Sequence, residues 1–210
     1  MSKIENKILA KIQIEKQDEV YNLLNKLNIV EDLQIKCLNK FQNYIPELKI
    51  EIKKSNIHGY GVFATKNIKK NEIITFYPAD IIIKKDKIGS KIYTSERYSE
   101  KKEENKTLTN WKNDGSPLNN PYLLNINKEY SIIGDSDFKD NLNYVGHLIN
   151  DGAKHNRTEK SKQIYMKIAF LKMNCCYEKS NTCVYIEAIK DIKKNEELFM
   201  AYGIDYWNVY

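Results

Sequence analysis

Arginine is nearly absent from this 210-residue sequence: among its 34 Lys and Arg residues, only Arg97 and Arg157 are arginine. Bidentate contacts to phosphate and to guanine depend mainly on the planar arginine side chain. The lysines are spread along the chain and interspersed with Glu and Asp, so the net charge of +6 marks no single basic surface. Despite a pI of about 8.9, we therefore expect no sequence-specific nucleic-acid binding.

Long apolar runs and metal-binding cysteine pairs are lacking as well. No stretch approaches the roughly 18 apolar residues of a membrane span, and the start, MSKIENKILAKIQ, has no apolar core of a secretion signal. We therefore expect a soluble intracellular protein with no membrane partner. The cysteines form no CxxC pair and have no histidine at zinc-finger spacing, which argues against a metal site and predicts reduced thiols. They are Cys37, Cys175, Cys176 and Cys183.

The chain divides by texture into two parts, residues 1–47 and residues 48–210. The first carries apolar residues at helical spacing, beginning with Ile4 and Ile8, and Pro46 closes it. We predict a helical N-terminal extension that packs against the domain or forms a homodimer. No cluster of ligand-type residues in this part suggests a catalytic role.

Residues 48–210 contain many short β-branched runs, interrupted by polar insertions at about 84–120 and 153–172. This pattern predicts an α+β fold that is mostly β and argues against a doubly wound parallel sheet. Residues 61–77 and 185–202 repeat one pattern, in which an Asx-Ile-Lys-Lys-Asn-Glu turn lies between two apolar strands. Each is predicted to be a hairpin whose turn Asn adopts a left-handed backbone.

Four short motifs could carry chemistry, although each alone is equally a structural feature. HGYGVFA (58–64) lets the backbone approach a ligand, but lacks the third glycine and the helix of a dinucleotide site. GHLINDG (146–152) either binds a polar ligand through its Asn or caps a turn. NCCYE (174–178) and FMAYG (199–203) each present a tyrosine, which is most often a core residue.

Taken together and in this order, the motifs resemble those of the SET-domain family of protein lysine methyltransferases, over about residues 49–207. GYGVFATKNIKKNEII is similar to the family's opening Gly-x-Gly motif, GHLIND to its Asn-His region, and AIKDIKKNEELFMAYG to its closing motif. The resemblance implies a SET-type fold of small curved sheets with a knot-like C-terminal segment. It also implies methyl transfer from S-adenosyl-L-methionine to a lysine side-chain amine.

The tyrosine pattern is closest to a monomethylating branch of that family. This branch has Phe-Tyr after the first hairpin, Gly-His before the Asn, then Asn-Cys-x-Tyr and Ala-Tyr-Gly, and the sequence carries each of them. The resemblance implies a lysine channel lined by Tyr77, Tyr177 and Tyr202. Tyr202 would be the main catalytic hydroxyl, while the other two hold the amine and limit the room for added methyl groups.

The same resemblance implies a cofactor site. The backbone of the Gly-x-Gly motif would face the methionine part of S-adenosylmethionine, and Asn150 would hold the adenine or the methionine amine. Trp207 would either stack on the adenine or close the core as a tail aromatic. The expected cofactor-binding residues are Gly59, Tyr60, Gly61, His147, Asn150, Asp151, Tyr202 and Trp207.

Departures from the family pattern leave alternatives open. Asp151 stands where the family commonly has His, which leaves the side-chain contact there undefined. A long insertion precedes Asn174, and Asn156 is the alternative match to the same family residue, which would remove Tyr177 from the channel. Met200 occupies a position where many members carry the Phe or Tyr that sets the degree of methylation.

The expected function is therefore that of a protein-lysine N-methyltransferase whose substrate is a histone or another lysine-bearing protein, with monomethyl-lysine as the product. A histone substrate would place it in the nucleus, and another substrate in the cytoplasm. The alternative is a catalytically weak or inactive SET-like module that binds a protein partner. An acidic group that could draw a basic peptide, and is equally a solvated helical face, consists of Glu96, Glu100, Glu103 and Glu104.

Overall fold

The structure, a computed structural model, describes residues 47–86, 89–94, 120–154, 157–179 and 184–209. The predicted helical extension, apart from its last residue, and the acidic group of residues 96–104 lie outside these ranges. No helix within them is long and apolar enough to cross a membrane.

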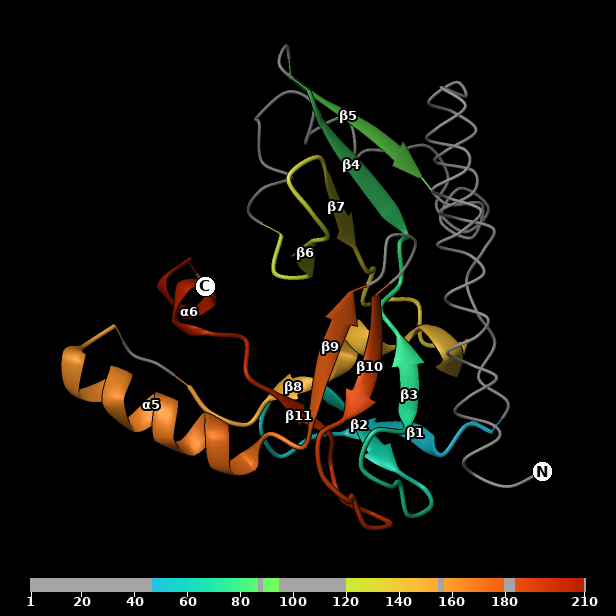
Figure 1. Cartoon of the computed structure of the whole chain (residues 1–210), viewed down its shortest axis with the longest axis vertical. Coiled ribbons are helices and arrows are strands. Elements are labelled where there is room, and N and C mark those ends of the chain that lie inside the picture. The colour runs from blue at the N-terminus through green and yellow to red at the C-terminus, as the bar shows by residue number, and fades with distance from the viewer. Residues whose placement is uncertain (1–46, 87–88, 95–119, 155–156, 180–183, 210) are drawn as a thin grey trace.

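Short strands dominate the described chain, as the β-branched pattern predicts (Figure 1). Between the strands lie two 3-10 turns, η2 (Leu142–Tyr144) and η3 (Gly146–Leu148). The strands are β1 (Ile50–Lys54), β2 (Tyr60–Ala64), β3 (Ile73–Phe76), β4 (Ile81–Asp86), β5 (Gly89–Thr94), β6 (Leu123–Asn125), β7 (Tyr130–Ile133), β8 (Asn150–Asp151), β9 (Cys175–Lys179), β10 (Val184–Ala188) and β11 (Phe199–Met200).

The strands form small separate sheets rather than one continuous sheet. Antiparallel pairing joins β1 to β2, arranges β3, β10 and β9 in that order, and builds a further sheet of order β5-β4-β7-β6. Figure 1 shows the β4–β7 sheet at one end of the molecule, β1 and β2 at the other, and β3, β10 and β9 between them. One pair is parallel: β11 runs beside β8, with Phe199 opposite Asn150 and Met200 opposite Asp151. The last strand is thereby inserted into the middle of the domain.

The two repeated segments, 61–77 and 185–202, do not form the predicted hairpins. The strands of each repeat pair elsewhere, β2 with β1 and β3 with β10 of the other repeat. At the middle of the repeats, the amide of Ile68 donates to the carbonyl of Ile192 at 2.9 Å, and the amide of Ile192 donates back at 2.9 Å. The local pattern specified the strands and turns correctly, but strand partners depend on contacts between distant segments.

The turn asparagines adopt the left-handed backbone that the sequence predicts, with φ of 65° at Asn71 and 71° at Asn195. The amide of Asn71 donates to the carbonyl of Ala188, at 2.6 Å, and that of Asn195 donates to the carbonyl of Ala64, at 2.7 Å. Each turn thus donates to the matching alanine of the other repeat. The two repeats therefore donate equivalent hydrogen bonds to each other.

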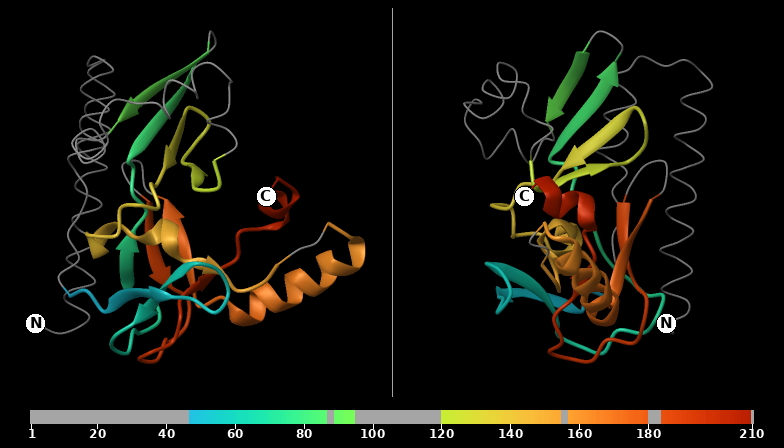
Figure 2. Two further views of the ribbon diagram at one scale, coloured as in Figure 1. Left: turned by 180° about the vertical axis from the view of Figure 1, so that it is seen from behind. Right: turned by 90° about the vertical axis from the view of Figure 1, so that its left-hand side faces the viewer.

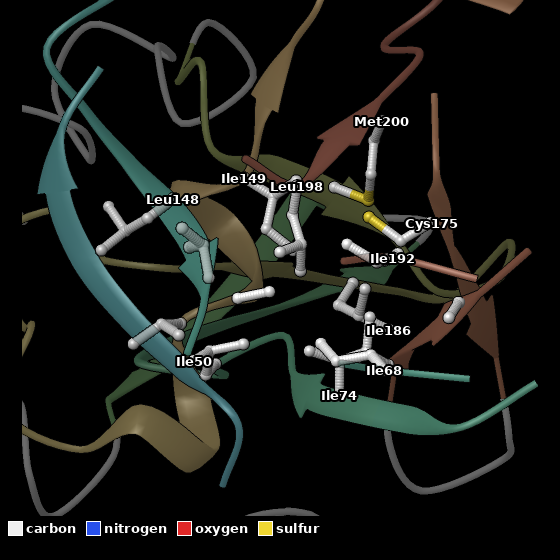
Figure 3. Close-up of a cluster of buried hydrophobic side chains, with 14 residues drawn as sticks. Ile50, Ile68, Ile74, Leu148, Ile149, Cys175, Ile186, Ile192, Leu198 and Met200 are labelled. Atoms are coloured by element: carbon white, nitrogen blue, oxygen red, sulfur yellow. The ribbon is translucent and has the colours of Figure 1, made fainter. Parts of the chain in front are cut away.

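Buried apolar side chains from both repeats share one core with β1, η3 and β11 (Figure 3). Full burial of an aliphatic side chain stabilises a fold by about 1.5–3 kcal/mol. The 3-10 turn η3 leads directly to Asn150, and β11 leads directly to Tyr202. Because η3 and β11 are part of this core, the core fixes the positions of the candidate site. The labelled members in Figure 3 are Ile50, Ile68, Ile74, Leu148, Ile149, Cys175, Ile186, Ile192, Leu198 and Met200.

The second insertion contains helix α5 (Glu159–Lys172), which projects away from the sheets (Figures 1 and 2). Its start is capped by Thr158, whose hydroxyl accepts from the amide of Ser161 at 3.1 Å. Tyr165 and Ala169 are its buried residues, and they pack against side chains of the C-terminal helix α6 (Ile204–Val209). Of the first insertion, residues 84–86 lie on β4 and residues 89–94 form β5, and the two strands pair antiparallel.

Candidate active site

A large cavity of about 580 Å³ is lined by the loop between β1 and β2, the residues of η3 and β8, and helix α6. Its volume lies within the range of small-molecule sites in proteins. Every residue predicted to bind the cofactor lines this cavity, with the exception of Gly61. The structure therefore brings the predicted residues of three distant segments, 59–60, 147–151 and 202–207, to one site.

A second, narrower cavity of about 110 Å³ is lined by all three tyrosines predicted to form the lysine channel. Tyr77 follows β3, Tyr177 lies on β9, and Tyr202 follows β11. Leu124 and Met200 contribute apolar wall to the same cavity. Its size suits a single extended side chain rather than a cofactor.

The two cavities share a wall made by Pro121, His147, Tyr202 and Tyr206. The hydroxyl of Tyr202 donates to the carbonyl of Ile149 at 2.7 Å, and its ring centroid lies 4.6 Å from that of Tyr206. The two cavities therefore lie side by side at Tyr202.

The other two tyrosines differ in their surroundings. The Tyr77 hydroxyl donates to the carbonyl of Tyr122 at 2.6 Å, and its ring lies edge-on to His147 with centroids 6.1 Å apart. Tyr177 is 41% exposed, with the amine of Lys179 5.3 Å from its ring centroid. Tyr77 is thus an inner wall of the narrow cavity, whereas Tyr177 lies toward solvent.

Burial raises the pKa of Tyr202 well above its usual value of 10, and the neighbouring ring of Tyr206 adds to the shift. Burial likewise raises the pKa of Tyr77, with the Tyr202 side chain as the next cause. Both hydroxyls therefore remain protonated at neutral pH. They act as hydrogen-bonding groups of fixed orientation, and not as bases.

A model of the SET domain matches residues 59–203, which is well over half of the chain. The chain belongs to the SET domain family. Among solved structures, the chain is similar to a Plasmodium falciparum candidate histone methyltransferase, with 21% sequence identity, coverage of 77% of this chain and 98% of that chain, and a TM-score of 0.34. No curated protein matches the sequence.

Gly61 of the SET Gly-x-Gly motif serves the packing behind the large cavity. A Cβ on Gly61 would lie 2.1 Å from Oε1 of Glu197 and 3.0 Å from Nδ2 of Asn150. Nδ2 of Asn150 donates to that Glu197 oxygen at 3.1 Å and to the carbonyls of His58 and Tyr60 at 3.2 and 3.0 Å. Asn150 therefore holds the loop between β1 and β2 in place, and the missing side chain of Gly61 leaves room for the Asn150 side chain.

Asp151, at the position where SET domains commonly carry His, has its side chain turned into the protein. The carboxylate is 4% exposed and accepts hydrogen bonds from Ala153 N (3.0 Å), the Tyr165 hydroxyl (2.7 Å), Tyr202 N (3.0 Å) and Trp207 Nε1 (3.0 Å). The ring of Trp207 lies nearly parallel to that of Tyr202, with centroids 6.3 Å apart. Asp151 thus orders the SET domain's closing segment.

Asn174, one of the two candidate matches to the second family asparagine, brackets the backbone that leads into β11. Nδ2 of Asn174 donates to the carbonyl of Glu197 at 2.8 Å, and its Oδ1 accepts from the amide of Phe199 at 2.8 Å. Asn174 also leads directly into β9, and Tyr177 on that strand lines the narrow cavity. Asn156 lies outside the described residues.

Sequence reasoning missed several residues that line these cavities. Tyr206 lies in the shared wall, and its only sequence signal was the aromatic richness of the tail. Lys139 and Lys154 bring positive charge to the large cavity, and the Lys139 amine lies 3.9 Å from the ring centroid of Tyr60. Neither lysine has a neighbouring motif that would mark it among the many lysines of this chain.

Proposed function

We propose that this SET domain is an S-adenosylmethionine-dependent methyltransferase that acts on the lysine side-chain amine of a protein and yields mainly monomethyl-lysine. The observation that carries the proposal is the meeting of a cofactor-sized cavity and a side-chain-sized cavity at Tyr202. An in-line displacement needs its two reactants to approach from opposite sides. Two cavities with a common wall supply that arrangement.

The residues of the large cavity fit S-adenosylmethionine. Gly59 has φ of +49°, and no protein atom lies within 4 Å of where its Cβ would be, so this backbone is open to the cavity. Trp207 offers an aromatic face to an adenine, and Lys139, Lys154 and Asp137 offer charges of both signs to an amino-acid moiety. When bound, S-adenosylmethionine supplies a methyl group activated by the positive sulfonium.

The narrow cavity favours the reactive form of the substrate. A free lysine amine has a pKa near 10.4 and is mostly protonated at neutral pH. The apolar wall that includes Leu124 and Met200 disfavours the charged ammonium and so favours the neutral amine. The hydroxyl of Tyr202 donates a hydrogen bond to the carbonyl of Ile149. The lone pairs of the hydroxyl oxygen can therefore accept an N–H of the amine and orient the nitrogen.

The monomethyl product follows from the crowding of this cavity by tyrosines. A neutral primary amine has two N–H groups. With one of them accepted by Tyr202, the other would be accepted by Tyr77 or Tyr177, where a second methyl group would otherwise lie. Replacing Tyr177 by Phe removes one hydroxyl without closing the cavity. We expect Tyr177→Phe to raise the share of dimethyl-lysine, measured by mass spectrometry of the methylated substrate protein. Abundant trimethyl-lysine made by the enzyme without the substitution would contradict the proposal.

The first test is Tyr202→Phe. We expect its kcat to fall about 100-fold, because the amine loses its fixed orientation. Its affinity for S-adenosylmethionine, measured by calorimetry, should stay within a few-fold of the unmodified protein. Tyr185→Phe is the matched control, because Tyr185 lies on β10 and lines neither cavity. Near-normal turnover in Tyr202→Phe would refute the assignment, and no cofactor binding by the unmodified protein would favour a binding module.

The protein substrate is open to a direct screen. Incubation with radiolabelled S-adenosylmethionine and separate arms of core histones and cell lysate would show which class accepts the methyl group. Labelled histone would support a nuclear role, and labelling confined to other proteins would support a cytoplasmic one. The Tyr202→Phe variant serves as the background control in every arm.

A further inference from the structure

We infer that the inserted helix α5 is part of the active site, because Tyr165 on α5 and Asp151 on β8 are positioning residues that fix Tyr202 and Trp207 against the cofactor cavity. The inference rests on the proposed function for its catalytic consequence. The contacts that carry it are independent of any ligand. They also explain how this chain accommodates Asp where the family commonly has His.

The buried side chains of Asp151 and Tyr165 meet in one hydrogen-bonded pair. The Tyr165 side chain is 1% exposed, and its hydroxyl donates to Oδ2 of Asp151 and accepts from the amide of Gly203 at 2.9 Å. Burial, followed by the Asp151 contact, raises the pKa of Tyr165, so the hydroxyl keeps its proton. A carboxylate oxygen accepts hydrogen bonds, and the four groups that meet Asp151 here are N–H or O–H donors.

Three donors on the closing segment converge on this pair: the amides of Tyr202 and Gly203 and the indole N–H of Trp207. These are the residues that carry the shared wall and the aromatic face of the cofactor cavity. The strand β11 that precedes the closing segment has only two residues, and its pairing holds only the N-terminal end of that segment. The Tyr165–Asp151 pair therefore determines where the closing segment lies.

Helix α5 is in turn held against the same segment by packing. Tyr165 and Ala169 share a cluster with Ile204 and Trp207 of α6, and Figures 1 and 2 show the two helices on the same side of the sheets. Nε of Arg157, just before α5, donates to the carbonyl of Trp207 at 3.3 Å. A displacement of α5 would therefore carry the closing segment with it.

The test compares Tyr165→Phe, Asp151→Asn and the control Tyr185→Phe in a Trp111→Phe background, where Trp207 is the only tryptophan. The first readout is the indole N–H resonance of Trp207 in ¹⁵N-labelled protein without ligand. We expect a downfield, slowly exchanging signal that shifts in Tyr165→Phe and Asp151→Asn but not in Tyr185→Phe. The second readout is the Kd for S-adenosylmethionine by calorimetry, which should rise about tenfold in Tyr165→Phe. That ratio is the loss of roughly one charge-assisted hydrogen bond.

The outcomes separate this inference from the proposed function. An indole signal that is unchanged in Tyr165→Phe overturns the inference, and so does a cofactor Kd within twofold of the control while the variant remains folded by circular dichroism. If the unmodified protein binds no S-adenosylmethionine, the proposed function fails, and the indole signal alone decides whether Tyr165 positions the closing segment. Tyr165→Phe keeps the ring and its packing, so it tests the hydroxyl even if Asp151→Asn does not fold.

Discussion

The removal of one side-chain amide, in Asn174→Ala, tests how the last strand is held in the domain. Asn174 is 5% exposed, and its amide makes two hydrogen bonds of 2.8 Å to the backbone of residues 197–199. The backbone N–H of Asn174 donates to the carbonyl of Phe199 at 3.1 Å, and the substitution leaves this hydrogen bond in place. The variant therefore removes the side-chain bracket and leaves the backbone contact.

The expected loss of stability follows from the groups that remain. The substitution leaves the carbonyl of Glu197 and the amide of Phe199, in two partly buried residues, without these partners. Each unsatisfied buried group costs about 1–3 kcal/mol, so the free energy of unfolding should fall by about 2–6 kcal/mol. A domain is stable by only about 5–15 kcal/mol in total. The variant should therefore be markedly less stable while still folding at low temperature.

Urea unfolding followed by circular dichroism measures this change. With a slope of about 1–3 kcal/mol per molar urea, the midpoint should fall by at least roughly 0.7 M. Asn208→Ala is the matched control, because Asn208 is exposed on α6, and surface substitutions of this kind usually change stability by less than about 0.5 kcal/mol. A fall of less than about 1 kcal/mol in Asn174→Ala would refute the reasoning that Asn174 anchors β11.

Three further predictions follow from the same structure. Gly61→Ala should lower stability by about 1–3 kcal/mol, because its Cβ meets Glu197 Oε1 at 2.1 Å, and adding Glu197→Ala should restore part of the loss in thermal unfolding. Since folding raises the pKa values of Tyr77 and Tyr202, the folded state keeps protons that the unfolded chain loses above about pH 10. Urea unfolding should therefore show constant stability from these groups up to pH 9 and a decline above pH 10, and a rise there would contradict the cause assigned. Burial, together with Glu178, raises the pKa of Cys176 to about 11. Alkylation of Cys176 at pH 8, followed by peptide-level mass spectrometry, should therefore be about 100-fold slower than alkylation of a free cysteine. Rapid labelling of Cys176 would exclude this environment.

The sequence was most informative where local chemistry decides the structure. The Lys-Asn pairs specified turns with a left-handed Asn, and both Asn71 and Asn195 have that backbone. The family motifs, taken in order, also specified which segments would meet, because their spacing reflects a known assembly. These features depend on neighbouring residues or on patterns already seen in other chains.

What the sequence could not specify were partners between distant segments. Nothing near Tyr165 indicates that its hydroxyl reaches Asp151 and Gly203, because the polar insertion resembles no family motif. The same limit explains the repeats, which were predicted as hairpins and instead exchange strands and hydrogen bonds with each other. Tyr206 was missed for a related reason, since a tail aromatic gives no sign of which cavity it faces. A side chain's partner is a property of the folded whole.

The parallel pairing of β11 with β8 also has a consequence for the order in which the protein is made. Asn150 and Asp151 leave the ribosome well before Phe199 and Met200, and the intervening residues include α5 and β9. Pairing between segments so far apart in the chain forms slowly, because the loop between them must first be closed. Until residues 199–207 are synthesised, the shared wall at Tyr202 does not exist. The second repeat and the core, which include Met200 and Tyr202, are completed only when this closing segment is inserted, so the shared wall between the two cavities is among the last parts of the domain to form.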